Sequence, residues 1–166
     1  MKLTKPGQLR SFAAYPRCSA DQTEGRVAAD LEQEAALVDA FVVPTKRERV
    51  LALLSKPKRR GDVLDTLYHH APLDPRCMTR VASHEQSARG IEALLRARGA
   101  PDLCYVISTD RTLDATTVQL STALSRIVGR GEGTIVSCIR GRLGYFEAED
   151  AGERYLLERR GGRTRG

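Results

Sequence analysis

The chain has 166 residues, of which 41% are hydrophobic and 29% are charged. This composition provides enough apolar residues for one core and is ordinary for a soluble domain. No apolar run approaches the roughly 18 residues that a membrane-spanning helix needs, so no membrane partner is expected. The formal net charge of +6 favours an anionic partner.

The four cysteines stand far apart in the sequence, at Cys18, Cys77, Cys104 and Cys138. Their spacing contains neither a CxxC pair nor a zinc-finger pattern. Cys104 and Cys138 fall inside predicted strands, where a free cysteine behaves as a small buried hydrophobe. The pattern predicts a reduced cytoplasmic protein with no metal and no cofactor.

Four helices are predicted in the first hundred residues, from apolar positions at helical spacing and from flanking prolines and glycines. They cover 24–42, 45–54, 61–70 and 84–99. A T-x-x-E pattern at 45–48 and an S-x-x-Q pattern at 83–86 predict capping boxes that open the second and fourth helices. Residues 1–22 are expected to be a disordered lead-in.

The second half of the chain changes character to short β-branched and aromatic runs, which predict strands. These strands cover 103–108, 134–139, 143–148 and 154–159. A predicted helix ending at Gly129 joins the first two, so they are expected to be parallel with a right-handed crossover. Short turns join the last three strands, which should therefore be antiparallel.

The expected class is mixed α/β, with four or five helices packed on a small mixed sheet of about four strands. The predicted element order is α-α-α-α-β-α-β-β-β. One domain should cover 23–159, with a helical half at 24–99 and a sheet half at 103–158. The Arg/Gly sequence of residues 160–166 predicts a disordered tail.

The glycines in "GRGEGTIVSCIRGRLGYF" (129–146) could suggest a phosphate-binding loop. A dinucleotide fingerprint requires G-x-G-x-x-G after a strand and before a helix. Here Gly129, Gly131 and Gly133 follow a predicted helix and precede a strand, which is the reverse order. We therefore interpret Gly129 as a helix C-cap, and Gly141 as the positive-φ residue of a turn between strands.

The strongest candidate site is the basic stretch 46–60, which contains seven cations and one acid, Glu48. Such a cluster can neutralise phosphates and release counterions. An intramolecular role competes, because the acidic helix 24–42 could lie against the stretch. With the arginines that flank the predicted turn at 140–142, the nucleic-acid-binding candidates are Lys46, Arg47, Arg49, Lys56, Lys58, Arg59, Arg60, Arg140 and Arg142.

An alternative ligand site follows the first predicted strand, in the sequence "STDRTLD" (108–114). Ligands of open α/β sheets bind beyond the carboxyl ends of parallel strands. Carboxylates and an arginine at this point could hold a metal or a phosphate, and the second strand would bring Arg140 to it. The competing interpretation is that Asp110 or Asp114 caps a helix. The candidate residues are Ser108, Asp110, Arg111 and Asp114.

Two weaker candidates complete the search. His69, His70, Asp74, Cys77 and His84 lie within 16 residues, but their spacing fits no zinc pattern, and a helix C-terminus explains the histidines. Arginines in the tail resemble RGG-type segments that bind RNA without folding.

The leading expectation is a cytoplasmic, basic, non-enzymatic domain that binds the backbone of RNA or DNA without base-specific readout. Aromatic residues make up only 5% of the chain, which argues against extensive base stacking. The first alternative is an enzyme or a phosphate or metal binder that uses 108–114, although no catalytic motif is present. The second is a protein-interaction module whose basic and acidic segments contact partners.

Overall fold

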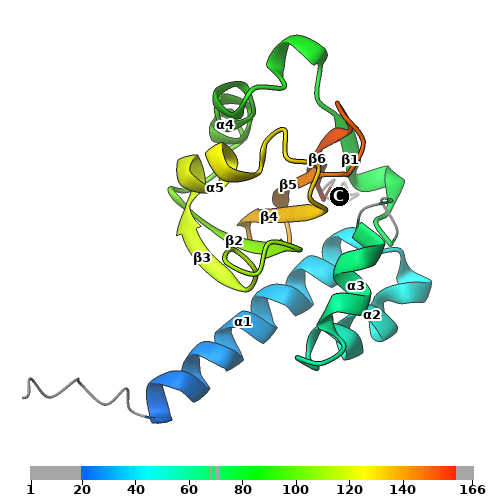
Figure 1. Cartoon of the computed structure of the whole chain (residues 1–166), viewed down its shortest axis with the longest axis vertical. Helices are drawn as coiled ribbons and strands as arrows, with labels where there is room; N and C mark the ends of the chain where they lie inside the picture. Colours follow the sequence, from blue (N-terminus) through cyan, green and yellow to red (C-terminus); the bar gives the residue numbers. More distant parts are fainter. Residues whose placement is uncertain (1–19, 68, 70–71, 160–166) are drawn as a thin grey trace, which may run out of the picture.

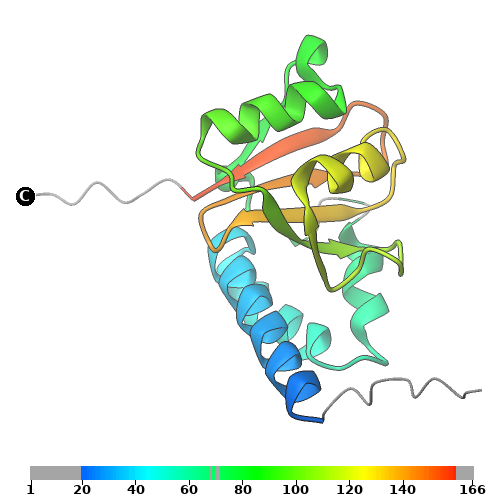
Figure 2. The same cartoon turned by 90° about the vertical axis from the view of Figure 1, so that its left-hand side faces the viewer.

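The computed structural model describes residues 20–67, 69 and 72–159. A six-stranded antiparallel sheet lies between two groups of helices, which gives three layers (Figure 1 and Figure 2). The mixed α/β class predicted from the sequence is therefore confirmed. The predicted strand count of about four and the predicted element order are wrong, because the sheet contains two further short strands, at 78–80 and 116–119. The strands run in the order β1-β6-β5-β4-β2-β3 across the sheet. Their bounds are β1 (Met78–Arg80), β2 (Leu103–Ser108), β3 (Thr116–Gln119), β4 (Thr134–Ile139), β5 (Leu143–Glu147) and β6 (Arg154–Glu158).

The predicted parallel pairing of the first two long strands is wrong. β2 and β4 are antiparallel neighbours, with Val106 opposite Val136. The cause is β3, a short strand that lies within the helix predicted to end at Gly129. After β2 the chain reverses direction and forms β3, which pairs with β2 in antiparallel fashion. The helix α5 (Leu120–Ile127) begins only after β3. This extra reversal sets the direction of β4. The antiparallel pairing of β4, β5 and β6 is as predicted.

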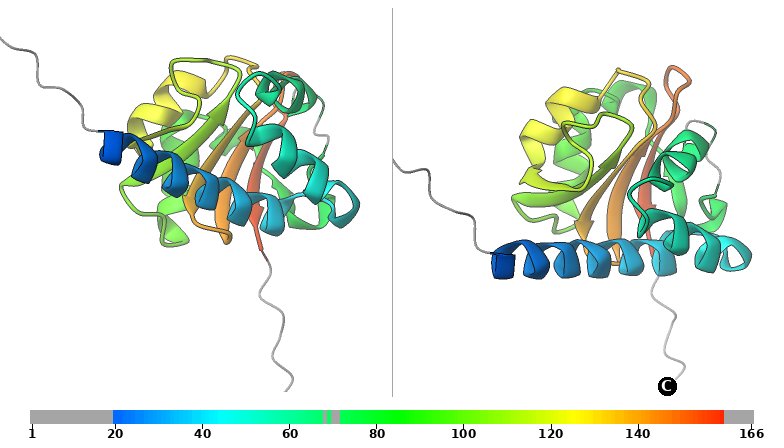
Figure 3. Two further views of the ribbon diagram at one scale, coloured as in Figure 1. Left: turned by 90° about the horizontal axis from the view of Figure 1, so that it is seen from below. Right: turned by 60° about the horizontal axis from the view of Figure 1, so that its bottom comes forward.

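The helices divide between the two faces of the sheet. On one face lie α1 (Ala20–Phe41), α2 (Arg47–Leu54) and α3 (Arg60–Leu67), and α1 crosses the strands (Figure 3). On the other face lie α4 (Ala88–Ala97) and α5. Each group buries its own apolar cluster because side chains alternate along the strands. None of the helices in the described ranges is long and apolar enough to span a membrane.

Both capping boxes predicted from the sequence are absent. Pro44 starts a 3-10 helix, η1 (Pro44–Lys46), so α2 begins at Arg47 without a side-chain cap. A second 3-10 helix, η3 (Ser83–Glu85), takes up the start of the other motif. The α4 helix begins only at Ala88, where Ser87 Oγ accepts a hydrogen bond from Gly90 N at 3.0 Å.

Glycines make the turns at both ends of β4. Gly129 follows α5 with a φ of +86°, which is the left-handed conformation expected just after a helix C-cap. Its N–H donates to the buried Glu147 Oε1 at 2.6 Å and thereby ties the loop before β4 to β5. Gly141 turns the chain between β4 and β5 with a φ of +63°, as its position in the sequence predicts.

Candidate anion-binding surface

The basic stretch 46–60 forms most of a helical hairpin made by α2 and α3. Pro44 begins the short η1 helix before it, and Pro57 lies in the loop between α2 and α3. Val50 and Leu54 of α2 are buried in the cluster that also contains the C-terminal part of α1. The polar positions of the stretch are therefore left to solvent or to neighbouring acidic side chains.

Arg60 is turned inward, and only 14% of its side chain is exposed. Its Nε and Nη2 donate to the two carboxylate oxygens of Asp114 at 2.6 and 2.9 Å, and Nη1 donates to Glu34 Oε1 at 2.6 Å. Burial alone would lower the pKa of Arg60, but the hydrogen bonds and charges of these carboxylates raise it above its ordinary value. Arg60 thus links α3, α1 and the loop after β2.

The two carboxylates bound by Arg60 have further donors. Tyr105 Oη donates to Glu34 Oε1 at 2.7 Å, and Ser108 N donates to Asp114 Oδ1 at 3.1 Å. Burial, followed by the hydrogen bond to Glu34, raises the pKa of Tyr105, so the phenol stays protonated. Glu34 is buried and is absent from the sequence-based candidates. The sequence signal for it is its place in the acidic helix 24–42, which the sequence allows to lie against the basic stretch 46–60; the contact between Glu34 and Arg60 agrees with that alternative.

Three more of the predicted cations are paired. Arg47 contacts Asp39 Oδ1 at 2.9 Å, Arg59 contacts Asp62 Oδ2 at 2.6 Å, and Arg140 contacts Glu32 Oε2 at 3.1 Å. Exposed pairs of this kind contribute little to stability because water screens them. They nevertheless lower the charge that these arginines present to a partner, and α1 supplies the acid for both Arg47 and Arg140.

The five remaining cations are exposed, and none forms an ion pair within the part of the chain that the structure describes. These cations are Lys46, Arg49, Lys56, Lys58 and Arg142. All except Arg142 lie within the helical hairpin or its loop. Their ammonium and guanidinium groups form the electropositive part of the α2–α3 region.

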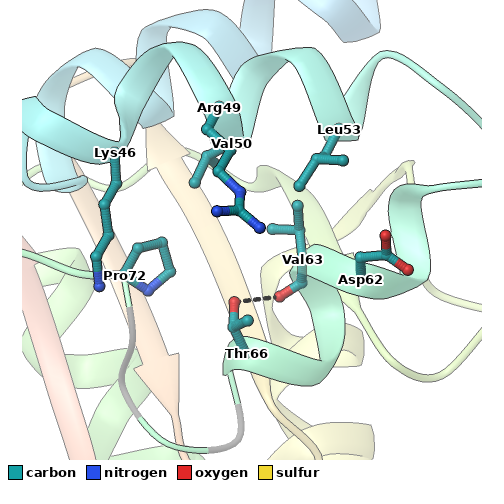
Figure 4. Close-up of a pocket in the computed structure, with 8 residues that line it drawn as sticks. All are labelled: Lys46, Arg49, Val50, Leu53, Asp62, Val63, Thr66 and Pro72. Atoms are coloured by element: carbon teal, nitrogen blue, oxygen red, sulfur yellow. Dashed lines mark hydrogen bonds between the residues drawn. The ribbon is translucent and has the colours of Figure 1, made fainter.

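A cavity opens on each side of α3. The first, of about 310 Å³, lies between α2 and α3 (Figure 4). It is lined by Lys46, Arg49, Val50, Leu53, Asp62, Val63, Thr66 and Pro72. The second, of about 430 Å³, lies between α3 and the loop after β2. It is lined by Pro57, Lys58, Arg60, Gly61, Leu64, Asp65, Thr109, Arg111 and Asp114.

The alternative ligand site is only partly assembled around the second cavity. Arg111 and Asp114 line it, but Ser108 Oγ is buried against Thr134 Oγ1 at 2.7 Å. Asp110 accepts hydrogen bonds from the backbone N–H and the hydroxyl of Thr112, which lower the pKa of Asp110, and it contacts Arg126 at 3.0 Å. Asp110 therefore organises its own turn.

Arg140 does not join this loop, contrary to the expectation from the sequence. That expectation required β2 and β4 to be parallel, so that their carboxyl ends would meet at one edge of the sheet. Because the two strands are antiparallel, the carboxyl end of β4 lies at the opposite end of β2. Arg140 contacts α1 there through Glu32.

The histidine and cysteine candidates give no assembled site. Asp74 is bound by Arg76 at 2.7 Å, and among the described residues no three His, Cys, Asp or Glu side chains gather as a metal-binding group. His70, the tail 160–166 and residues 1–19 of the predicted lead-in lie outside the described residues. Residues 20–22, which the sequence-based prediction assigns to the lead-in, form the start of α1 instead. Burial raises the pKa of both Cys104 and Cys138 to about 12, which keeps their thiols protonated and unreactive at neutral pH.

The fold and this surface define an α/β domain in which several of the exposed cations that have no ion pair in the described structure lie on or beside one helical hairpin. No protein-family model matches the chain, and neither a curated protein nor a solved structure matches it.

Proposed function

We propose that this protein binds the phosphate backbone of a nucleic acid through the exposed cations of its helical hairpin. The observation that carries the proposal is a group of four exposed cations close together in the sequence, none with an acidic partner in the described structure: Lys46, Arg49, Lys56 and Lys58. The eight residues of α2 extend over about 12 Å. At about 3.4 Å of axis per phosphate on one strand, that length spans three or four phosphates.

The same surface argues against base-specific readout. Base edges are read by short polar side chains on an element that enters a groove. The helix that follows the basic loop carries exposed Asp62 and Asp65, whose charges a groove would repel. The exposed side chains on the α2 side of the hairpin are mainly long cations, which suit phosphate contacts that position a partner without reading its sequence.

Salt dependence tests this proposal directly. Four duplex phosphate contacts would give a slope of log affinity against log salt of about −3.6, at about 0.9 per contact. We expect this slope between 50 and 200 mM salt, measured by fluorescence anisotropy with a labelled duplex, and equal affinity for a scrambled sequence of the same length. A flat response to salt would contradict the proposal.

Two double variants that remove the same charge at different places distinguish binding by the hairpin from non-specific attraction by the net charge of the protein. The double variant Lys56→Gln, Lys58→Gln should reduce the slope by about 1.8, since two phosphate contacts are lost. Its control is Arg89→Gln, Arg130→Gln, which removes the same charge from exposed positions on α4 and after α5. Equal losses in the two variants would show that net charge, rather than this hairpin, attracts the nucleic acid.

The cavity beside the loop after β2 supports a second candidate, binding of a small ligand. Lys58 from the loop before α3 and Arg111 from the loop after β2 both line it, and the Thr109 hydroxyl is buried without a hydrogen-bond partner in the described structure. A ligand with several oxygen atoms could accept from all three groups. Phosphate, pyrophosphate and nucleoside phosphates are the probes, and a shift of the Thr109 amide resonance in NMR titrations would support this candidate.

We further propose that the protein works in the cytoplasm. Cys77, Cys104 and Cys138 are free thiols, although the latter two lie on the neighbouring strands β2 and β4. Free cysteines in such an arrangement are typical of a reducing compartment. Mass spectrometry of freshly isolated protein after alkylation would test this, and oxidised cysteines would contradict it.

A further inference from the structure

The cavity between α2 and α3 combines two features that a nucleic-acid backbone does not need. Its inner wall is apolar: Val50 and Val63 are almost fully buried, Pro72 is also buried, and the half-buried Leu53 extends the wall toward solvent. Its volume of about 310 Å³ lies at the lower end of the range for small-molecule sites, which is about 300–1,000 Å³. A phosphate backbone alone would leave this apolar surface uncovered.

Two cations stand over this apolar wall. Lys46 and Arg49 are three residues apart, so they project from the same side of the chain, and Figure 4 shows the Arg49 side chain extending toward α3 and the Lys46 side chain extending beside Pro72. The Arg49 guanidinium lies near Val63, and the Lys46 ammonium lies beside Pro72 (Figure 4). Two like charges at this spacing repel each other, so an anion between them would relieve the repulsion.

The acid in the wall of this cavity does not neutralise the two cations. Among the described residues that line the cavity, Asp62 is the one acid, and Arg59 Nε contacts its Oδ2 at 2.6 Å. The Thr66 hydroxyl donates to Val63 O at 2.6 Å, as the dashed line in Figure 4 shows. The charged groups left without a partner in the described part of this lining are therefore both cationic.

The cavity on the other side of α3 lacks this imbalance. There, Lys58 and Arg111 face the exposed Asp65 and the pair formed by Arg60 and Asp114. Arg60 is also shared with the buried Glu34, so the three-residue cluster as a whole is negative and offsets part of the positive charge. Of the two cavities, the one between α2 and α3 is therefore better suited to an anion that has an apolar body.

We propose that this cavity binds a small amphipathic anion, with an aryl or short acyl body against Val50, Leu53 and Val63 and a carboxylate or phosphate head between Lys46 and Arg49. The planar guanidinium of Arg49 can donate two parallel hydrogen bonds to either head group. Burial of the apolar body supplies the main driving force, and the two cations select the charged head. This site shares Lys46 and Arg49 with the proposed nucleic-acid surface, but the binding of a small amphipathic anion does not depend on the nucleic-acid function.

The test uses the full chain and three probes that share one apolar body: 2-naphthoate, 2-naphthyl phosphate and the neutral 2-naphthylmethanol. The chain contains no tryptophan, so naphthyl fluorescence can be followed without tryptophan emission. We expect saturable 1:1 binding of at least one anion, at least tenfold tighter than that of the neutral probe or of inorganic phosphate. Preference for naphthoate would identify a carboxylic acid ligand, and preference for naphthyl phosphate a phosphate ester; both results support the site.

Substitutions of the two cations test whether the anion binds in this cavity. Lys46→Gln and Arg49→Gln should each weaken the preferred anion about tenfold while leaving the neutral probe unchanged. Lys56→Gln is the matched control, because Lys56 is an exposed cation of the same stretch that is not among the lining residues. Methyl resonances of Val50 and Val63 should shift on binding. Equal affinity for neutral and anionic probes, insensitivity to both substitutions, or shifts confined to other residues would overturn the proposal, whereas the salt test with nucleic acid would be unaffected.

Discussion

The two sides of α3 show how differently the same type of side chain can be used. On the side toward the sheet, Arg60 is buried between Glu34 and Asp114. On the side toward α2, Lys46 and Arg49 stand over an apolar cavity without an acid of their own. These cations belong to a single stretch of fifteen residues, 46–60. A cation of this stretch stabilises the fold when a carboxylate from a distant segment pairs with it, and it can bind a partner when no carboxylate does.

The largest expected effect is on the buried side. Arg60→Met leaves Glu34 and Asp114 without their shared cation, and breaking a buried pair by removing one partner costs about 3–5 kcal/mol. Urea unfolding monitored by circular dichroism would measure this loss. The control is Arg59→Met, which removes the neighbouring, exposed arginine and should change the free energy of unfolding by less than about 1 kcal/mol. If both substitutions lowered the free energy of unfolding equally, burial between the two carboxylates would not be what makes Arg60 important.

A smaller effect is expected at the phenol that completes the buried cluster. Tyr105→Phe removes the hydroxyl that donates to Glu34 Oε1 at 2.7 Å. The carboxylate keeps Arg60, so the expected loss is about 1.5–3 kcal/mol, the usual range for a hydrogen bond to a charged group. Combined with Arg60→Met, the two losses should not add, because both act on Glu34. Strict additivity in the double variant would mean that the cluster is not one unit.

The smallest effect is expected from acid titration of the turn beside the cluster. Hydrogen bonds from Thr112, helped by the charge of Arg126, lower the pKa of Asp110 in the folded protein below its ordinary value. The carboxylate therefore stabilises the fold above its unfolded pKa of about 3.9, and this contribution is lost as the pH falls through the folded pKa. The urea midpoint should drop below pH 4, and Asp110→Asn should flatten that part of the profile. An unchanged profile would place the acid sensitivity elsewhere.

Much of the element pattern could be predicted because it depends on local signals. Buried positions such as Leu37, Val38 and Phe41 recur at helical spacing, and the strands 103–108 and 134–139 are continuous apolar runs. The short strand β3 could not be found in this way. Its four residues, "TTVQ", alternate between half-buried and exposed. They lie within a segment whose apolar spacing predicts one continuous helix ending at Gly129, so the sequence gives no separate signal for a strand. Missing that one reversal was enough to invert the predicted direction of β4.

The sequence by itself determined the mixed α/β class, the concentration of charge at 46–60 and the turns at Gly129 and Gly141, because hydrophobic period, net charge and glycine conformation are properties of neighbouring residues. The tertiary structure decided which cations are free. Arg60 meets Glu34 and Asp114, residues 26 and 54 positions away, and no local pattern encodes those distances. The cavity beside Lys46 and Arg49 likewise exists only because two short helices pack at a distance that leaves their apolar sides incompletely filled.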